Sequence, residues 1–133
     1  MRARCTGAGL LALLLSTPLL LAPTLPAPLD KDWIYLGNDY GVEMYWKVKP
    51  PVTSSGAETA LLRFINTNGY PVRVSYTPTF TCNGSYDQTD TRAGVTIRAG
   101  ATKSGSYDGL WHIPCQPGER ITYLNISYDV ERQ

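Results

Sequence analysis

The chain has 133 residues, of which 43% are hydrophobic and 17% charged, and its formal net charge is +1. Two of the twelve basic residues, Arg2 and Arg4, stand in the first four positions, and without them ten basic and eleven acidic residues remain, a net charge of −1. Nucleic-acid binding needs a basic patch that follows the phosphates. No such cluster is present, so we expect no nucleic-acid partner.

The start of the chain has the pattern of a cleavable export signal. Arg2 and Arg4 form a short basic segment, and a mostly apolar run covers residues 10–21. This run is too short to span a bilayer comfortably, which makes an uncleaved anchor the less favoured alternative. We predict a signal peptide over residues 1–27, a single domain over residues 28–133 in the periplasm or outside the cell, and no membrane span after cleavage.

Three cysteines are present, and Cys5 would leave with the signal peptide. Cys82 and Cys115 then form an even pair in an oxidising compartment, which predicts a structural disulfide. Their spacing is unlike the C-x-x-C pattern of a redox-active pair. Closing this loop should contribute about 3–4 kcal/mol to the stability of the domain.

Apolar and polar residues alternate repeatedly after residue 30, and no window has a sustained helical period, which predicts β-strands. The first strand is expected at residues 33–36, followed by a turn over residues 37–41. The next strand should place four apolar side chains on one face: Val42, Met44, Trp46 and Val48.

Two prolines at positions 50 and 51 should end that strand, because proline cannot donate to a ladder. The apolar strand at residues 60–65 is followed by Asn68-Gly69, a dipeptide typical of tight hairpin turns. Residues 72–76 alternate and are therefore expected to be the hairpin partner of residues 60–65.

The polar segment over residues 83–94 is long for a compact domain, so it is the best candidate for a functional loop. Strands are then expected at residues 95–99, 110–115 and 121–130, the last being the longest. Seven or eight short strands predict a small antiparallel β-sandwich of immunoglobulin-like or fibronectin-like outline. A small closed β-barrel is the alternative.

Catalysis would have to rely on few groups. His112 is the one histidine, and Asp108 is near it in sequence. A small hydrolase using His112 or a pair of carboxylates is therefore one hypothesis, although an imidazole within an apolar strand is more often a packing residue.

Metal binding has weak support. One histidine and two paired cysteines cannot complete a zinc site. Oxygen ligands from Asn83, Asp87 and Asp90 could surround calcium, but their spacing does not match a calcium loop, and a solvated loop is the preferred interpretation. We expect no metal and no cofactor.

Aromatic residues favour a binding role, since three tryptophans and nine tyrosines are many for this length. The candidate surface consists of Trp33, Tyr35, Tyr40 and Tyr45, or of the segment with Asn83, Asp87 and Asp90. Core packing of the aromatic residues is the competing explanation.

Two N-glycosylation sequons begin at Asn83 and Asn125, and both would be acceptors only if the source is eukaryotic.

The sequence thus predicts an exported, non-enzymatic binding module, with a carbohydrate or an extracytoplasmic protein as partner. The small hydrolase is the second hypothesis. A third is an inhibitor or assembly factor that presents a loop or a sheet edge to a partner protein.

Overall fold

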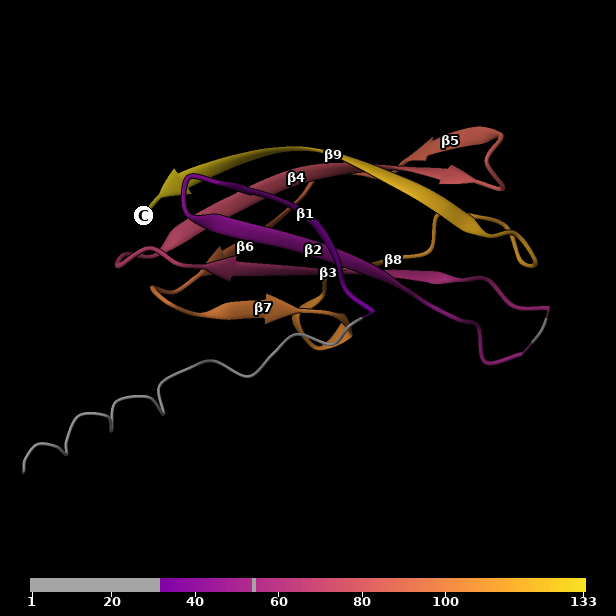
Figure 1. Ribbon diagram of the computed structural model, residues 1–133, viewed down its shortest axis with the longest axis horizontal. Helices are drawn as coiled ribbons and strands as arrows, with labels where there is room; N and C mark the ends of the chain where they lie inside the picture. Colours follow the sequence, from indigo (N-terminus) through magenta and orange to yellow (C-terminus); the bar gives the residue numbers. More distant parts are fainter. Residues whose placement is uncertain (1–31, 54) are drawn as a thin grey trace, which may run out of the picture. The chain divides into compact units, whose positions relative to one another are not determined.

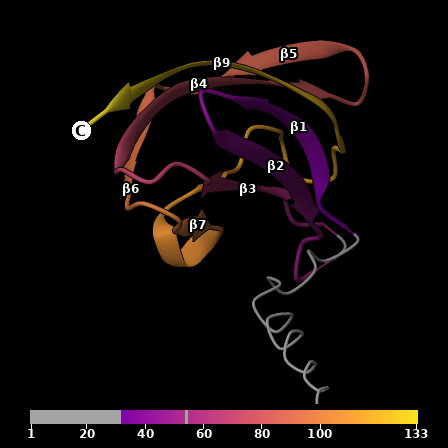
Figure 2. The ribbon, with the colours of Figure 1, turned by 60° about the vertical axis from the view of Figure 1, so that its left-hand side comes forward.

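The computed structural model describes residues 32–133 except residue 54, so the predicted signal peptide over residues 1–27 lies outside the described residues. The described part consists of two antiparallel sheets that face each other across an apolar core, as Figure 1 and the turned view in Figure 2 show. Within the same residues, no helix is long and apolar enough to cross a membrane.

The first sheet has five strands, in which β1, β2 and β3 follow one another and the short β7 and β8 pair with the far side of β3. Their bounds are β1 (Ile34–Asp39), β2 (Val42–Lys49), β3 (Thr59–Asn66), β7 (Thr102–Ser104) and β8 (Trp111–His112). A 3-10 helix, η3 (Ser106–Asp108), lies between β7 and β8.

The second sheet has four strands built around β4, which pairs with β9 on one side and with β5 and β6 on the other. Their bounds are β4 (Val72–Cys82), β5 (Tyr86–Thr89), β6 (Ala93–Ile97) and β9 (Ile121–Arg132). β9 is the longest strand, as the sequence predicts.

Strict alternation places the core between the sheets, because successive side chains of a strand point to opposite faces. Every second residue of β2, β3 and β4 is buried over most of each strand. The larger buried side chains come from both sheets: Met44, Trp46, Leu62, Phe64, Tyr76, Phe80, Ile97 and Leu124. The inward face expected for Val42, Met44 and Trp46 is therefore confirmed.

The hairpin between β1 and β2 turns at Tyr40 and Gly41, whose φ angles are 49° and 76°. Two successive positive φ angles are typical of the tight turns that match the twist of paired strands. A Cβ atom at position 41 would lie 2.3 Å from Oδ1 of Asn68, so this turn also needs glycine because the next turn packs against it.

The expected hairpin between residues 60–65 and 72–76 is wrong, because β3 and β4 belong to different sheets. Gly69 does not have the positive φ angle of a tight hairpin turn. Residues 67–71 instead carry the chain from one sheet to the other. Each of the two strands has one apolar side. Placing the strands in two sheets that pack against each other buries both apolar sides in the same core.

The expected long loop over residues 83–94 is also wrong, since it contains all of β5 and the start of β6. β4 continues through Pro78 without a break. The carbonyl of Pro78 accepts a hydrogen bond from the backbone N–H of Asp90, so its ring nitrogen also points to that side, between β5 and β6. Pro78 lies between the part of β4 that pairs with β6 and the part that pairs with β5, so its missing N–H interrupts neither pairing.

The barrel alternative is excluded for the described residues, because every strand pairing lies within one of the two sheets. The small antiparallel β-sandwich is confirmed.

Candidate functional site

Aromatic and cationic side chains gather on the outer side of the five-stranded sheet. Met44 and Trp46 point into the core, so the alternate residues of β2 point outward. The strand register places Tyr35, Tyr45 and Arg63 in one row across β1, β2 and β3. We call this surface the aromatic face and define it by Trp33, Tyr35, Tyr45, Lys47, Arg63 and Trp111.

Trp33 is the centre of a cation–π cluster on the aromatic face. The guanidinium carbon of Arg63 lies 4.4 Å from the centroid of the Trp33 ring, and Nζ of Lys47 lies 4.9 Å from it. Nε of Arg63 also donates a hydrogen bond to Oγ of Ser104 at 3.0 Å. These contacts hold both cations against the sheet instead of leaving them extended in solvent.

Tyr35 and Tyr45 form the other aromatic contact of this face, with ring centroids 5.4 Å apart. The hydroxyl of Tyr45 donates to Oε1 of Glu43 at 2.9 Å. Burial, and then this bond to the Glu43 carboxylate, raise the pKa of Tyr45 above its usual range. Tyr45 is thus held in its neutral form and oriented, while the ring of Tyr35 is 58% exposed.

A surface pocket of about 400 Å³ adjoins the aromatic face at the end of β2. Its lining includes the stem of Lys47 together with Lys49, Leu61 and Asp32. Trp111 lies next to Leu61 in the register between β3 and β8 and is 48% exposed. Lys47, Leu61 and Trp111 therefore form a second row across β2, β3 and β8.

The structure brings together three of the four predicted aromatic residues, Trp33, Tyr35 and Tyr45. Tyr40 is separate, since it occupies the turn between β1 and β2. Its carbonyl accepts a hydrogen bond from the side chain of Asn68. Tyr40 is therefore part of the end of the sandwich and not of the aromatic face.

The second predicted surface, with Asn83, Asp87 and Asp90, does not converge on a ligand. Oδ1 of Asn83 accepts from the backbone N–H of Arg120, and Oδ1 of Asp87 accepts from the hydroxyl of Thr81. Asp90 is bonded to a histidine, as described next. Because these oxygens serve three different partners, the hairpin gives no support to a calcium site.

His112 connects the two sheets through both of its ring nitrogens. Nδ1 lies 2.7 Å from Oδ2 of Asp90, and Nε2 lies 3.1 Å from the hydroxyl of Tyr76. An ionised carboxylate only accepts hydrogen bonds, so Nδ1 carries a proton, and when the ring has only that proton Nε2 accepts from the hydroxyl of Tyr76. The bond to His112 is the main reason that the pKa of Asp90 is lowered.

The carboxylate that contacts His112 is not the one nearest to it in the sequence. The carboxylate next to His112 belongs to Asp90, whereas Asp108 accepts a hydrogen bond from the backbone N–H of Ser104. Aspartate, histidine and tyrosine follow one another as in a catalytic triad, but the tyrosine hydroxyl is fully buried. His112 and its two partners therefore link β8 with β4 and with the segment after β5.

Replacing Tyr76 with phenylalanine tests this link. Burial, and then the Asp90 charge, raise the pKa of Tyr76 to about 12, so its contribution to stability is complete below about pH 10 and is lost as the pH rises toward about 12. At pH 8 we expect Tyr76→Phe to lower the free energy of unfolding by about 1 kcal/mol, because His112 loses its donor.

The difference in free energy of unfolding between wild type and Tyr76→Phe should shrink and then reverse as the pH rises. The wild type loses stability because Tyr76 ionises more readily in the unfolded chain, whereas phenylalanine cannot ionise. Urea unfolding of both proteins between about pH 8 and about pH 12 measures it. If the difference in free energy of unfolding stays constant over this range, burial does not raise the pKa of Tyr76.

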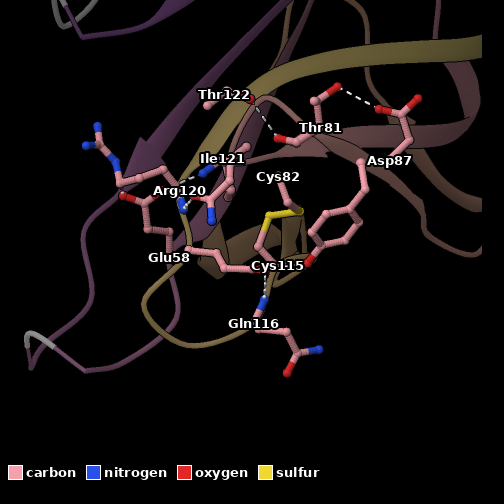
Figure 3. The surroundings of a disulfide bond; sticks show 12 residues. Glu58, Thr81, Cys82, Asp87, Cys115, Gln116, Arg120, Ile121 and Thr122 are labelled. Atoms are coloured by element: carbon pink, nitrogen blue, oxygen red, sulfur yellow. Dashed lines mark hydrogen bonds and ion pairs between the residues drawn. A yellow bond between two sulfur atoms is a disulfide. The ribbon is translucent and has the colours of Figure 1, made fainter.

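The Cys82–Cys115 disulfide is present and joins the end of β4 to the segment after β8 (Figure 3). Glu119 lies close to both sulfur atoms, but the cysteines are bonded to each other and offer no thiolate to a metal. The carboxylate of Glu119 accepts hydrogen bonds from the hydroxyl of Tyr86 and the backbone N–H of Gln116. A formed disulfide is typical of an oxidising compartment.

Comparison with known proteins gives no assignment: no protein-family model, curated protein or solved structure matches this chain.

Sequence reasoning missed Arg63, Lys47 and Trp111 as members of the aromatic face. The outward positions of β2 and β3 could have pointed to the two cations, since they alternate with core residues. Nothing in the sequence places Trp111 beside them, because β8 joins the sheet from a distant part of the chain.

Proposed function

We propose that this protein is an exported, non-enzymatic binding module and that the aromatic face is its binding surface. The observation that carries the proposal is that Trp33, Tyr35, Tyr45 and Trp111 all lie on the outer side of one sheet, away from the core. Export is supported by the signal-like start of the sequence and by the disulfide.

Aromatic residues on the outer side of a sheet call for an explanation, because packing of the core does not require them there. Tyr35 and Trp111 are about half exposed on opposite edges of the same sheet. Such rings combine a flat apolar surface with a polar group and bind sugars or protein partners with little loss of side-chain entropy. A carbohydrate or an extracytoplasmic protein is therefore the class of partner that we propose.

The two other hypotheses have less support from the geometry. A hydrolase based on His112 would need the hydroxyl bonded to its ring to reach a substrate, and the hydroxyl of Tyr76 is buried. An inhibitor or assembly factor acting through a sheet edge would find its longest edge strand in β9, but charged residues at the end of β9, Asp129, Glu131 and Arg132, are typical of edges that resist pairing.

The proposal predicts that the double substitution Tyr35→Ser with Trp111→Ser lowers affinity for the partner about 5-fold to 150-fold, since each ring contributes about 0.5–1.5 kcal/mol. The measurement is binding to arrays of extracellular polysaccharides and to immobilised envelope proteins. Tyr123→Ser is the matched control, because Tyr123 is 61% exposed on β9 of the other sheet.

Both variants should unfold at nearly the wild-type temperature, because all three side chains are exposed. Equal loss of binding in the control, or full binding by the double variant, would place the binding surface elsewhere.

A further inference from the structure

Positive charge accompanies the aromatic rings of the proposed binding surface, although the mature region has a net charge of −1. Lys47, Lys49 and Arg63 all project from the outer side of the five-stranded sheet. Two carboxylates lie nearby, Glu43 on β2 and Asp32 beside the pocket. The hydrogen bond from Tyr45 leaves the Glu43 carboxylate charged, so these three cations exceed the two carboxylates by one charge.

Arg63 has the geometry of a prepared anion-binding group. Its guanidinium carbon lies 4.4 Å from the centroid of the Trp33 ring, and Nε donates to Ser104. These two contacts hold the plane of the guanidinium group against the sheet. A guanidinium that is oriented in advance loses less entropy when it forms paired hydrogen bonds with a carboxylate.

The same surface offers rings to an apolar partner. Tyr35 and Arg63 lie in the same row across the sheet, with Tyr45 between them. The faces of aromatic rings are electronegative and attract the weakly positive C–H groups of a sugar ring. One ligand could therefore rest on Tyr35 while it presents a carboxylate to Arg63.

Two other anionic partners fit less well. Attraction to an anionic membrane surface usually relies on a cluster of about four to eight basic residues, and among the described residues three basic side chains accompany this face. An acidic peptide is usually captured along a sheet edge or in a groove. The rings and cations here lie across the strands, on the face of the sheet.

We infer that the aromatic face binds an acidic oligosaccharide whose sugar units carry carboxylate groups. The inference rests on the proposed function and specifies its ligand: Tyr35 stacks on a sugar ring, Arg63 pairs with a carboxylate, and Lys47 and Lys49 attract further carboxylates near the pocket.

The test is calorimetric titration with an oligogalacturonate and with its methyl ester, which has the same sugar rings without the charges. We expect the acid to bind and the ester to bind more weakly. Arg63→Gln should weaken binding of the acid about 10-fold to 100-fold, since a hydrogen bond to a charged group contributes about 1.5–3 kcal/mol. Affinity for the acid should also fall as salt is raised.

Arg73→Gln is the matched control, because Arg73 also bonds a hydroxyl, that of Thr96, but lies on the outer side of the other sheet. It should bind the acid with the wild-type affinity. Equal effects of the two substitutions would overturn the inference.

Failure of this inference can be told apart from failure of the proposed function. Equal affinity for acid and ester, with both weakened by Tyr35→Ser, would overturn the acidic ligand and keep the binding face. No binding of either compound would also overturn it, and the array experiment with Tyr35→Ser and Trp111→Ser then decides the proposed function by itself.

Discussion

Replacing Cys82 and Cys115 together with alanine should lower the free energy of unfolding by about 4 kcal/mol. The two residues are 33 positions apart, and their bond joins the end of β4 in one sheet to the segment after β8 near the other. Without it the unfolded chain gains the freedom of a long loop. Because small domains are stable by only about 5–15 kcal/mol, this is a large fraction of the total.

Urea unfolding of a chain that spans residues 28–133, before and after reduction, measures this effect. Reduced wild type keeps the sulfur atoms in the core but loses the covalent link, so it should lose nearly as much stability as the double variant. Reduction that leaves the urea midpoint unchanged would contradict the prediction.

The second large effect is expected at Asn66, a fully buried side chain at the end of β3. Its amide nitrogen donates to the backbone carbonyls of Tyr70, Ile97 and Arg98, and its oxygen accepts from Asn68. Asn66→Leu has a similar volume but removes all of these bonds. We expect a loss of about 3–5 kcal/mol, because several buried backbone groups lose their partners together.

Thermal and urea unfolding of Asn66→Leu measure this loss, with Asn38→Ala as control, because Asn38 is exposed on β1. The control should stay within about 0.5 kcal/mol of wild type. Asn66→Asp keeps an acceptor for Asn68 but turns a carboxylate toward three carbonyls, so it should also be destabilised at neutral pH. If Asn66→Leu is as stable as wild type, the hydrogen bonds from the Asn66 amide to these carbonyls do not stabilise the fold.

The disulfide and Asn66 hold the two sheets together at different places. Near the disulfide, Glu58 also accepts a hydrogen bond from the backbone N–H of Ile121 and pairs with Arg120, as Figure 3 shows. Asn66 instead connects the turn after β3 with the end of β6. Both groups hold together strands that belong to different sheets.

The candidate site was only partly predictable from the sequence. Trp33, Tyr35 and Tyr45 are close in sequence on one hairpin, and alternation places them on its outer side. Trp111 comes from a separate strand, and Arg63 joins them through the pairing of β2 with β3. Asp90 and His112 are 22 positions apart, and proximity along the chain wrongly favoured Asp108.

The amino-acid sequence alone determined the fold class, the inward faces of the strands and the pairing of the two cysteines. Each follows from a local pattern, either period-two alternation or an even cysteine count in an oxidising compartment. Only the tertiary structure decided that β3 and β4 lie in different sheets, which carboxylate meets His112, and which cations stack on Trp33. These depend on strand pairing, which brings distant residues together because it buries two apolar faces against each other.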